Sequence, residues 1–118
     1  MISMREAYEK IGADYDGASV RLMGEEMLAR FALKFLDDES MDKFEAAMAA
    51  GDAESAFMAV HTLKGVSQNL GFDNLYEPAV VVTEALRNAD TVDGARDGMH
   101  SLRQQYAATM SALREAAE

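Results

Sequence analysis

The chain has 118 residues, no cysteine and a formal net charge of −10, because 21 acidic side chains face only 11 lysines and arginines. This length is typical of a single domain with one hydrophobic core, and the lack of cysteine excludes disulfide bonds and thiolate metal sites. The negative charge repels nucleic-acid backbones, so we expect no DNA or RNA partner.

No apolar run approaches the length of about 18 residues that a membrane-spanning helix needs. Residues 1–8 also lack the apolar centre of a secretory signal peptide. We therefore expect a cytoplasmic protein with no membrane association. Separately, we expect it to be a monomer.

The N-terminal part of the chain predicts short elements. Apolar residues at helical spacing predict an amphipathic helix over 4–11, packed across one end of the fold. Glycines and aspartates in 12–17 predict a connector. Val20 and Leu22 then fit a short turn of helix.

Two longer helices should follow, over 25–37 and from Ser40 to Gly51. Acidic residues in the first turn favour the start of the first one, and Ser40 is the expected N-cap of the second. The predicted inner faces comprise Leu28, Phe31, Ala32, Phe35, Met41, Phe44 and Met48.

Asp52 is well placed to cap the next helix, which we expect to run to Leu70 and to end at Gly71 in the left-handed conformation. On a helical wheel at about 100° per residue, the apolar side chains gather on one side. They are Ala56, Ala59, Leu63, Val66 and Leu70. His61 falls nearly opposite their centre and should face solvent.

Five further side chains are predicted on the His61 face, since residues three, four and seven apart stack along a helix. They are Phe57, Met58, Lys64, Gly65 and Gln68. This combination is unusual for a simple solvated surface. It joins a histidine to a cation, a position without a side chain, an amide and two large apolar groups.

This combination fits a histidine that accepts a phosphoryl group, because a neutral exposed imidazole has a lone pair that can attack phosphorus. The added phosphate carries about −1.5 to −2 charges, which Lys64 could stabilise. Gly65 is disfavoured in a helix by about 1 kcal/mol relative to alanine, so it indicates clearance for a partner beside the ring. Phe57 and Met58 would give that partner an apolar contact.

The remainder of the chain predicts two more helices. Asn74 and Glu77 resemble a capping box, with Pro78 in the first turn of a helix that ends near residue 90. The last helix should span 92–116. The expected inner faces comprise Leu75, Ala79, Val82 and Leu86, followed by Met99, Leu102, Tyr106, Thr109 and Leu113.

These stripes and short connectors predict an all-α fold, an antiparallel four-helix bundle with one or two additional short N-terminal helices. We expect a single domain over 1–118, with the N-terminal helix and connector in 1–23 and the bundle in 24–117.

The run from His61 to Gly71 reads His-Thr-Leu-Lys-Gly-Val-Ser-Gln-Asn-Leu-Gly. It resembles the signature of histidine-containing phosphotransfer (HPt) domains, which is His-x-Leu-Lys-Gly followed by small residues and Leu-Gly. Members of that family are four-helix bundles that take a phosphoryl group from the aspartate of one response-regulator receiver domain and pass it to another.

The resemblance implies that His61 is the phosphoryl acceptor and donor, that Lys64 stabilises the phosphate and that Gly65 provides clearance. The family's structural positions correspond to Ser67, Leu70 and Gly71. In several members the residue that orients the histidine comes from the next helix, but the neighbourhood of Thr83 and Glu84 contains no glutamine. Gln68 carries a donor on the correct face for a hydrogen bond.

The function implied is that of a free-standing phosphocarrier in a two-component phosphorelay. The partners would be receiver domains and a hybrid histidine kinase. The chain would bind no cofactor itself, since Mg²⁺ would come with the receiver. The sequence has no Gly-rich nucleotide loop, so we expect no ATP-dependent kinase activity.

An alternative is a non-catalytic helical module that sequesters a partner through Phe57 and Met58. These two side chains could instead pack under the N-terminal helix. His100 lacks the Leu-Lys-Gly context and is expected to be a surface histidine, and no helical metal-ligand spacing predicts a metal site. Arg87 is either a plain surface residue or a contact to the receiver or the phosphate.

Overall fold

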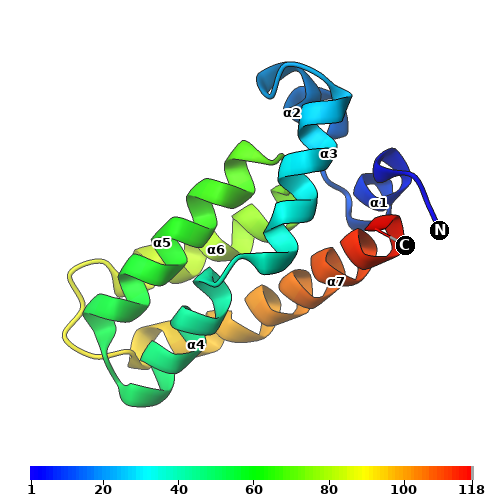
Figure 1. Ribbon diagram of the computed structural model, residues 1–118. Helices are drawn as coiled ribbons and strands as arrows, with labels where there is room; N and C mark the ends of the chain where they lie inside the picture. The colour runs from blue at the N-terminus through cyan, green and yellow to red at the C-terminus, as the bar shows by residue number, and fades with distance from the viewer. Residues whose placement is uncertain (118) are drawn as a thin grey trace.

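Four columns of helix form the body of the molecule and run alternately up and down (Figure 1). In the first column, α3 (Glu25–Lys34) and α4 (Ser40–Ala50) lie end to end. The other columns are α5 (Ala53–Asn69), α6 (Asp73–Leu86) and α7 (Met99–Ala117). The predicted all-α antiparallel bundle is therefore confirmed.

The computed structural model describes residues 1–117, and within this range it contains no strand. Two short helices, α1 (Met4–Ile11) and α2 (Tyr15–Arg21), precede the bundle. Helix α1 has the predicted limits, whereas α2 is longer than the expected turn and shortens the connector. Within the described residues, no helix combines the length and apolar character that would let it cross a membrane.

The first column is interrupted where the sequence predicted one helix over 25–37. Helix α3 ends at Lys34, and a 3-10 helix, η1 (Phe35–Asp37), leads into α4. The prediction of Ser40 as an N-cap is wrong, because Ser40 already belongs to α4 and its backbone N–H donates to Asp38 Oδ1 at 2.8 Å. The acidic side chain two residues earlier thus takes the capping role.

The core lies between the four columns. Its largest fully buried side chains comprise Tyr8, Leu28, Phe44, Leu63, Phe72, Leu75, Leu86, Leu102 and Leu113. Each such burial contributes about 1.5–3 kcal/mol. Two residues that were predicted to face the core are less buried than expected. Phe31 is 37% exposed, with Lys34 Nζ 5.6 Å from its ring centroid. Tyr106 is only half-buried.

Helix α6 begins at Asp73, so the predicted capping box is also wrong. The amide of Asn74 instead donates across the bundle to Gln105 Oε1 at 2.9 Å and Thr109 Oγ1 at 3.1 Å, both on α7. Pro78 consequently lies inside α6 rather than in its first turn. Before α7, a second 3-10 helix, η2 (Asp93–Gly98), replaces the expected start of the last helix near residue 92.

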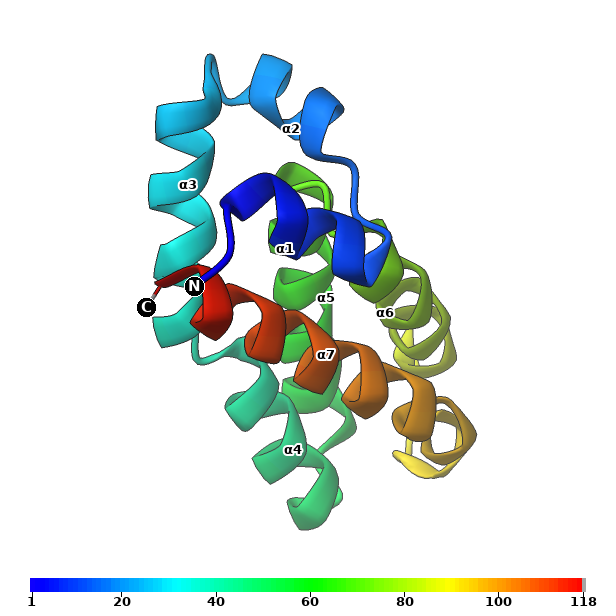
Figure 2. The same cartoon turned by 90° about the vertical axis from the view of Figure 1, so that its right-hand side faces the viewer.

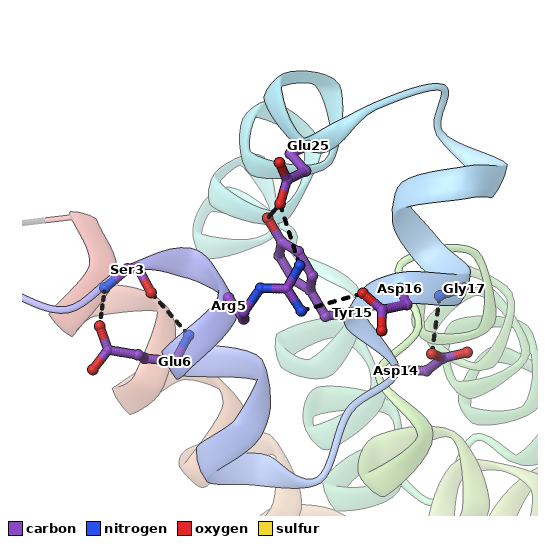
Figure 3. A network of polar contacts seen from close by, with 8 residues as sticks. All are labelled: Ser3, Arg5, Glu6, Asp14, Tyr15, Asp16, Gly17 and Glu25. Atoms are coloured by element: carbon purple, nitrogen blue, oxygen red, sulfur yellow. Dashed lines mark hydrogen bonds and ion pairs between the residues drawn. The ribbon is translucent and has the colours of Figure 1, made fainter.

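The two N-terminal helices cover the end of the bundle, with α1 against the C-terminal part of α7 (Figure 2). Figure 3 shows the polar contacts that join them to α3. Arg5 pairs with Asp16 at 3.2 Å and with Glu25 at 3.5 Å, and the Tyr15 hydroxyl donates to Glu25 at 3.0 Å. The guanidinium also lies 4.5 Å from the Tyr15 ring centroid.

The same N-terminal segment satisfies carbonyl groups at the end of α5. The buried Tyr8 hydroxyl donates to Leu70 O at 2.7 Å, and Arg21 donates to Asn69 O at 3.1 Å and to Gln68 O at 3.0 Å. Burial raises the pKa of Tyr8 well above its usual range, which keeps this hydroxyl protonated as a donor. A cation such as Arg21 also complements the negative end of the helix dipole.

Gly71 allows this close approach. Its φ of 74° is left-handed, as predicted, and its carbonyl accepts a hydrogen bond from the Asp14 N–H at 2.8 Å. A Cβ at this position would lie 2.5 Å from Asp14 O and 2.9 Å from Ala18 Cβ. Gly71 is thus required both by the turn and by the packing of the N-terminal segment.

We predict that Tyr8→Phe lowers the free energy of unfolding by about 1–3 kcal/mol, because it leaves the Leu70 carbonyl buried without its donor. Urea denaturation followed by circular dichroism measures this loss. The matched variant Tyr15→Phe removes a more exposed hydrogen bond and should cost less than about 1 kcal/mol. Equal losses in the two variants would contradict the capping role of Tyr8.

Candidate functional site

Helix α5 packs between α4 and α6 and leaves one face at the surface (Figure 1). Its N-cap is Asp52, as predicted, whose carboxylate accepts from the Ser55 N–H at 3.1 Å. The buried side comprises Ala53, Ala56, Ala59, Val60, Leu63 and Ser67. Val66, which the wheel placed on this side, is half-buried.

His61 lies midway along α5 with its side chain exposed, as the wheel predicted. Its ring stacks on Phe57, one turn earlier, with 5.6 Å between ring centroids and only 10° between the planes. No hydrogen bond to the imidazole is formed by any side chain from Met1 to Ala117. Stacking on Phe57 is therefore the contact that restrains the ring.

Phe57 and Met58 occupy different environments. Phe57 is half-buried against the core, and the Arg87 Cζ lies 5.2 Å from its ring centroid. Met58 is 62% exposed. Helix α1 lies at the other end of the molecule, so packing of these side chains under the N-terminal helix is excluded (Figure 1).

Arg87 is held by a two-point ion pair with Glu84, in which Nε and Nη2 donate to the carboxylate at 3.2 Å and 3.0 Å. These hydrogen bonds with Arg87 lower the pKa of Glu84, and the positive charges of Arg87 and Lys64 act in the same direction. The cations Arg87, just after α6, and Lys64, on α5, thus lie near one carboxylate close to His61.

Lys64 is half-buried and forms no ion pair with any residue in the described part of the chain. Gly65 follows on the exposed surface. A Cβ built on Gly65 would have no atom within 4 Å beyond its own helix backbone. Packing within the described residues therefore does not require glycine at this position.

The residue expected to orient His61 by a hydrogen bond is not found among the candidates. Thr83 is buried and its hydroxyl donates to Ala79 O at 2.6 Å within α6, so this donor is already engaged. Glu84 is engaged by Arg87. Gln68 is exposed, about 10 Å further along the helix axis from His61 at 1.5 Å per residue.

An open groove runs between α4 and α5 beside Met58 and Thr62. Its lining comprises Lys43, Ala46, Ala47, Ala50, Asp52, Glu54, Ser55, Met58, Ala59 and Thr62. The small side chains along its floor leave room for apolar groups of another protein. His100 lies on α7, is exposed as predicted and has no part in this surface.

Sequence reasoning missed the contacts of Phe57 and Arg87. The spacing of Phe57 and His61 at i and i+4 is the available signal, because such residues are neighbours on a helix. Likewise Glu84 and Arg87 are separated by three positions, which favours an ion pair. The contact between Arg87 and the Phe57 ring, in contrast, depends on how α6 packs against α5.

A family model described as Hpt domain matches residues 26–116, which is more than half of the chain. The chain belongs to the Hpt domain family. No curated protein and no solved structure matches it. HPt domains are phosphotransfer modules of two-component systems, carriers rather than kinases, and they interact with receiver domains and histidine kinases.

The family match places α1 and α2 before the matched region, although both pack on the end of the helix that carries His61. In this HPt domain the N-terminal segment therefore supports the bundle directly. The exposed face of α5, with His61, Lys64 and Gly65, lies wholly within the matched residues.

We predict that Gly65→Ala raises the free energy of unfolding by about 0.5–1 kcal/mol, since alanine fits the open space and favours the helix. Gly71→Ala should lower it, because that position has a left-handed φ and no room for a Cβ. Urea denaturation of both variants tests the contrast. A destabilised Gly65→Ala would show that this glycine serves the fold.

Proposed function

We propose that this HPt domain carries a phosphoryl group on His61 between the aspartates of two receiver domains in the cytoplasm. The observation that carries the proposal is the exposed His61 ring next to the open space above Gly65, on the one face of α5 that the bundle leaves free. A receiver could bring its phosphoaspartate to the ring from this side.

In the transfer, a ring nitrogen of His61 attacks the phosphorus. An N–P bond forms while the O–P bond to the aspartate breaks, and the aspartate leaves as a carboxylate. The reverse step on a second receiver restores the free imidazole. Any Mg²⁺ would be held by the receiver, where it would neutralise charge on the phosphoryl oxygens, and we expect this chain to bind no cofactor of its own.

Lys64 would stabilise the phosphoryl oxygens electrostatically, since its ammonium group has no carboxylate partner among the described residues. Met58 and the groove between α4 and α5 would provide apolar contact to the receiver. Gln68, two turns from the histidine, would meet the receiver at the edge of the same face.

We predict that His61→Gln abolishes transfer from a ³²P-labelled receiver domain, because the nucleophilic nitrogen is lost. The chain has two histidines, so His100→Gln is the matched control and should be labelled like the unmodified protein. Labelling of His61→Gln would contradict the proposal. Receiver binding without any labelling of the unmodified protein would favour the non-catalytic interaction module.

We predict that Lys64→Ala slows transfer about tenfold or more at saturating receiver, because a charge-assisted contact to the phosphoryl group is lost. Rapid-quench measurement of single-turnover transfer tests this. Arg30→Ala on α3 removes an equal charge from an exposed site and should leave the rate unchanged. Equal rates for all three proteins would rule out the role of Lys64.

A further inference from the structure

We infer that Phe57 is a positioning residue for phosphoryl transfer, which holds the His61 imidazole in its reactive orientation by stacking. This inference rests on the proposed function and deepens it. It assigns to an aromatic ring on α5 the role that no hydrogen-bonding side chain among the described residues fills.

The geometry of the pair favours positioning over simple contact. The two rings are nearly parallel, at 10°, with their centroids 5.6 Å apart. An exposed side chain on a helix samples several rotamers. Aligning the ring with a phosphoryl group restricts it to one of them, which costs conformational entropy. A stacked neighbour one turn away reduces that freedom before the receiver arrives.

Stacking restrains the ring without blocking its chemistry. The lone pair of an imidazole nitrogen lies in the plane of the ring, whereas the Phe57 ring lies nearly parallel to that plane and offset from it. On the opposite side along the helix, Gly65 presents no side chain. His61 therefore has an aromatic ring beside it at i−4 and open space at i+4. The phosphoaspartate of a receiver could reach the imidazole from the open side.

Phe57 is itself held in place. It packs partly against the hydrophobic core, and the Arg87 guanidinium lies 5.2 Å from its ring centroid. Arg87 in turn is fixed by the two hydrogen bonds to Glu84. A continuous series of contacts thus runs from α6 through Phe57 to the imidazole, and it anchors the exposed ring to the body of the bundle.

The competing role, an apolar contact to the receiver, fits the neighbouring Met58 better. Met58 is 62% exposed, while Phe57 is half-buried and already has two groups against its ring. A positioning residue changes the rate of transfer within the bound complex. A docking residue changes the receiver concentration at half-saturation, so the two roles can be separated kinetically.

The test compares Phe57→Leu with Phe57→Tyr, which retains an aromatic ring. In Phe57→Leu we expect the single-turnover transfer rate at saturating receiver to fall about three- to tenfold, the range that the free energy of an aromatic pair allows. The half-saturating receiver concentration should stay within about twofold. Phe57→Tyr should restore the rate.

A second readout does not depend on transfer. In the unmodified protein, the ring current of Phe57 should displace the His61 carbon-bound proton resonances from their usual positions, and Phe57→Leu should remove this displacement, with His100 as the internal reference. Phe31→Leu on α3 is the matched control, since Phe31 also has a cation over its ring but no stacked histidine. It should change neither the rate nor the His61 resonances.

An unchanged rate at saturation in Phe57→Leu, or a change only in half-saturation, would overturn the positioning role. So would unchanged His61 resonances. Circular dichroism of each variant checks that the bundle is intact. If Phe57→Leu unfolds, Phe57→Tyr alone tests the positioning role. A folded Phe57→Tyr variant that transfers more slowly than the unmodified protein would contradict that role. Absence of label on His61 in the unmodified protein would instead refute the proposed function.

Discussion

Helix α5 packs between α4 and α6 through a stripe of small and branched side chains, and this packing decides which residues remain at the surface. Ala56, Ala59 and Ser67 let the neighbouring helices approach closely, while Val60 and Leu63 fill the core. With that side buried, the 3.6-residue period of the helix leaves His61 toward solvent. The exposure of His61 thus follows from the burial of the opposite face.

The end of α5 depends on residues far away in the sequence. Tyr8 and Arg21 donate to its last carbonyls, and Gly71 admits the Asp14 backbone beside it. Both donors precede the region that matches the HPt family model. The helix that carries the histidine is therefore anchored at one end by its own N-cap, at the other by the N-terminal segment, and along its side by the bundle.

Local signals in the sequence predicted much of this arrangement. Asp52 and Gly71 mark the limits of α5, and the apolar period places His61 outside, because caps and periodicity act over a few residues. The start of α6 was mispredicted, since the Asn74 amide bonds to α7 rather than to its own helix. The stacking of His61 on Phe57 could have been predicted from their i and i+4 spacing. The contact between the Arg87 guanidinium and the Phe57 ring depends on tertiary packing and could not.

The claim that His61 carries the phosphoryl group is tested most directly by locating the modification itself. The protein would be incubated with a panel of phosphorylated receiver domains, and mass spectrometry under neutral conditions would map any acid-labile, base-stable phosphate. The predicted result is a single phosphoryl group on His61. Label on another residue, including His100, or no label from receivers that phosphorylate an established HPt domain in parallel, would contradict it.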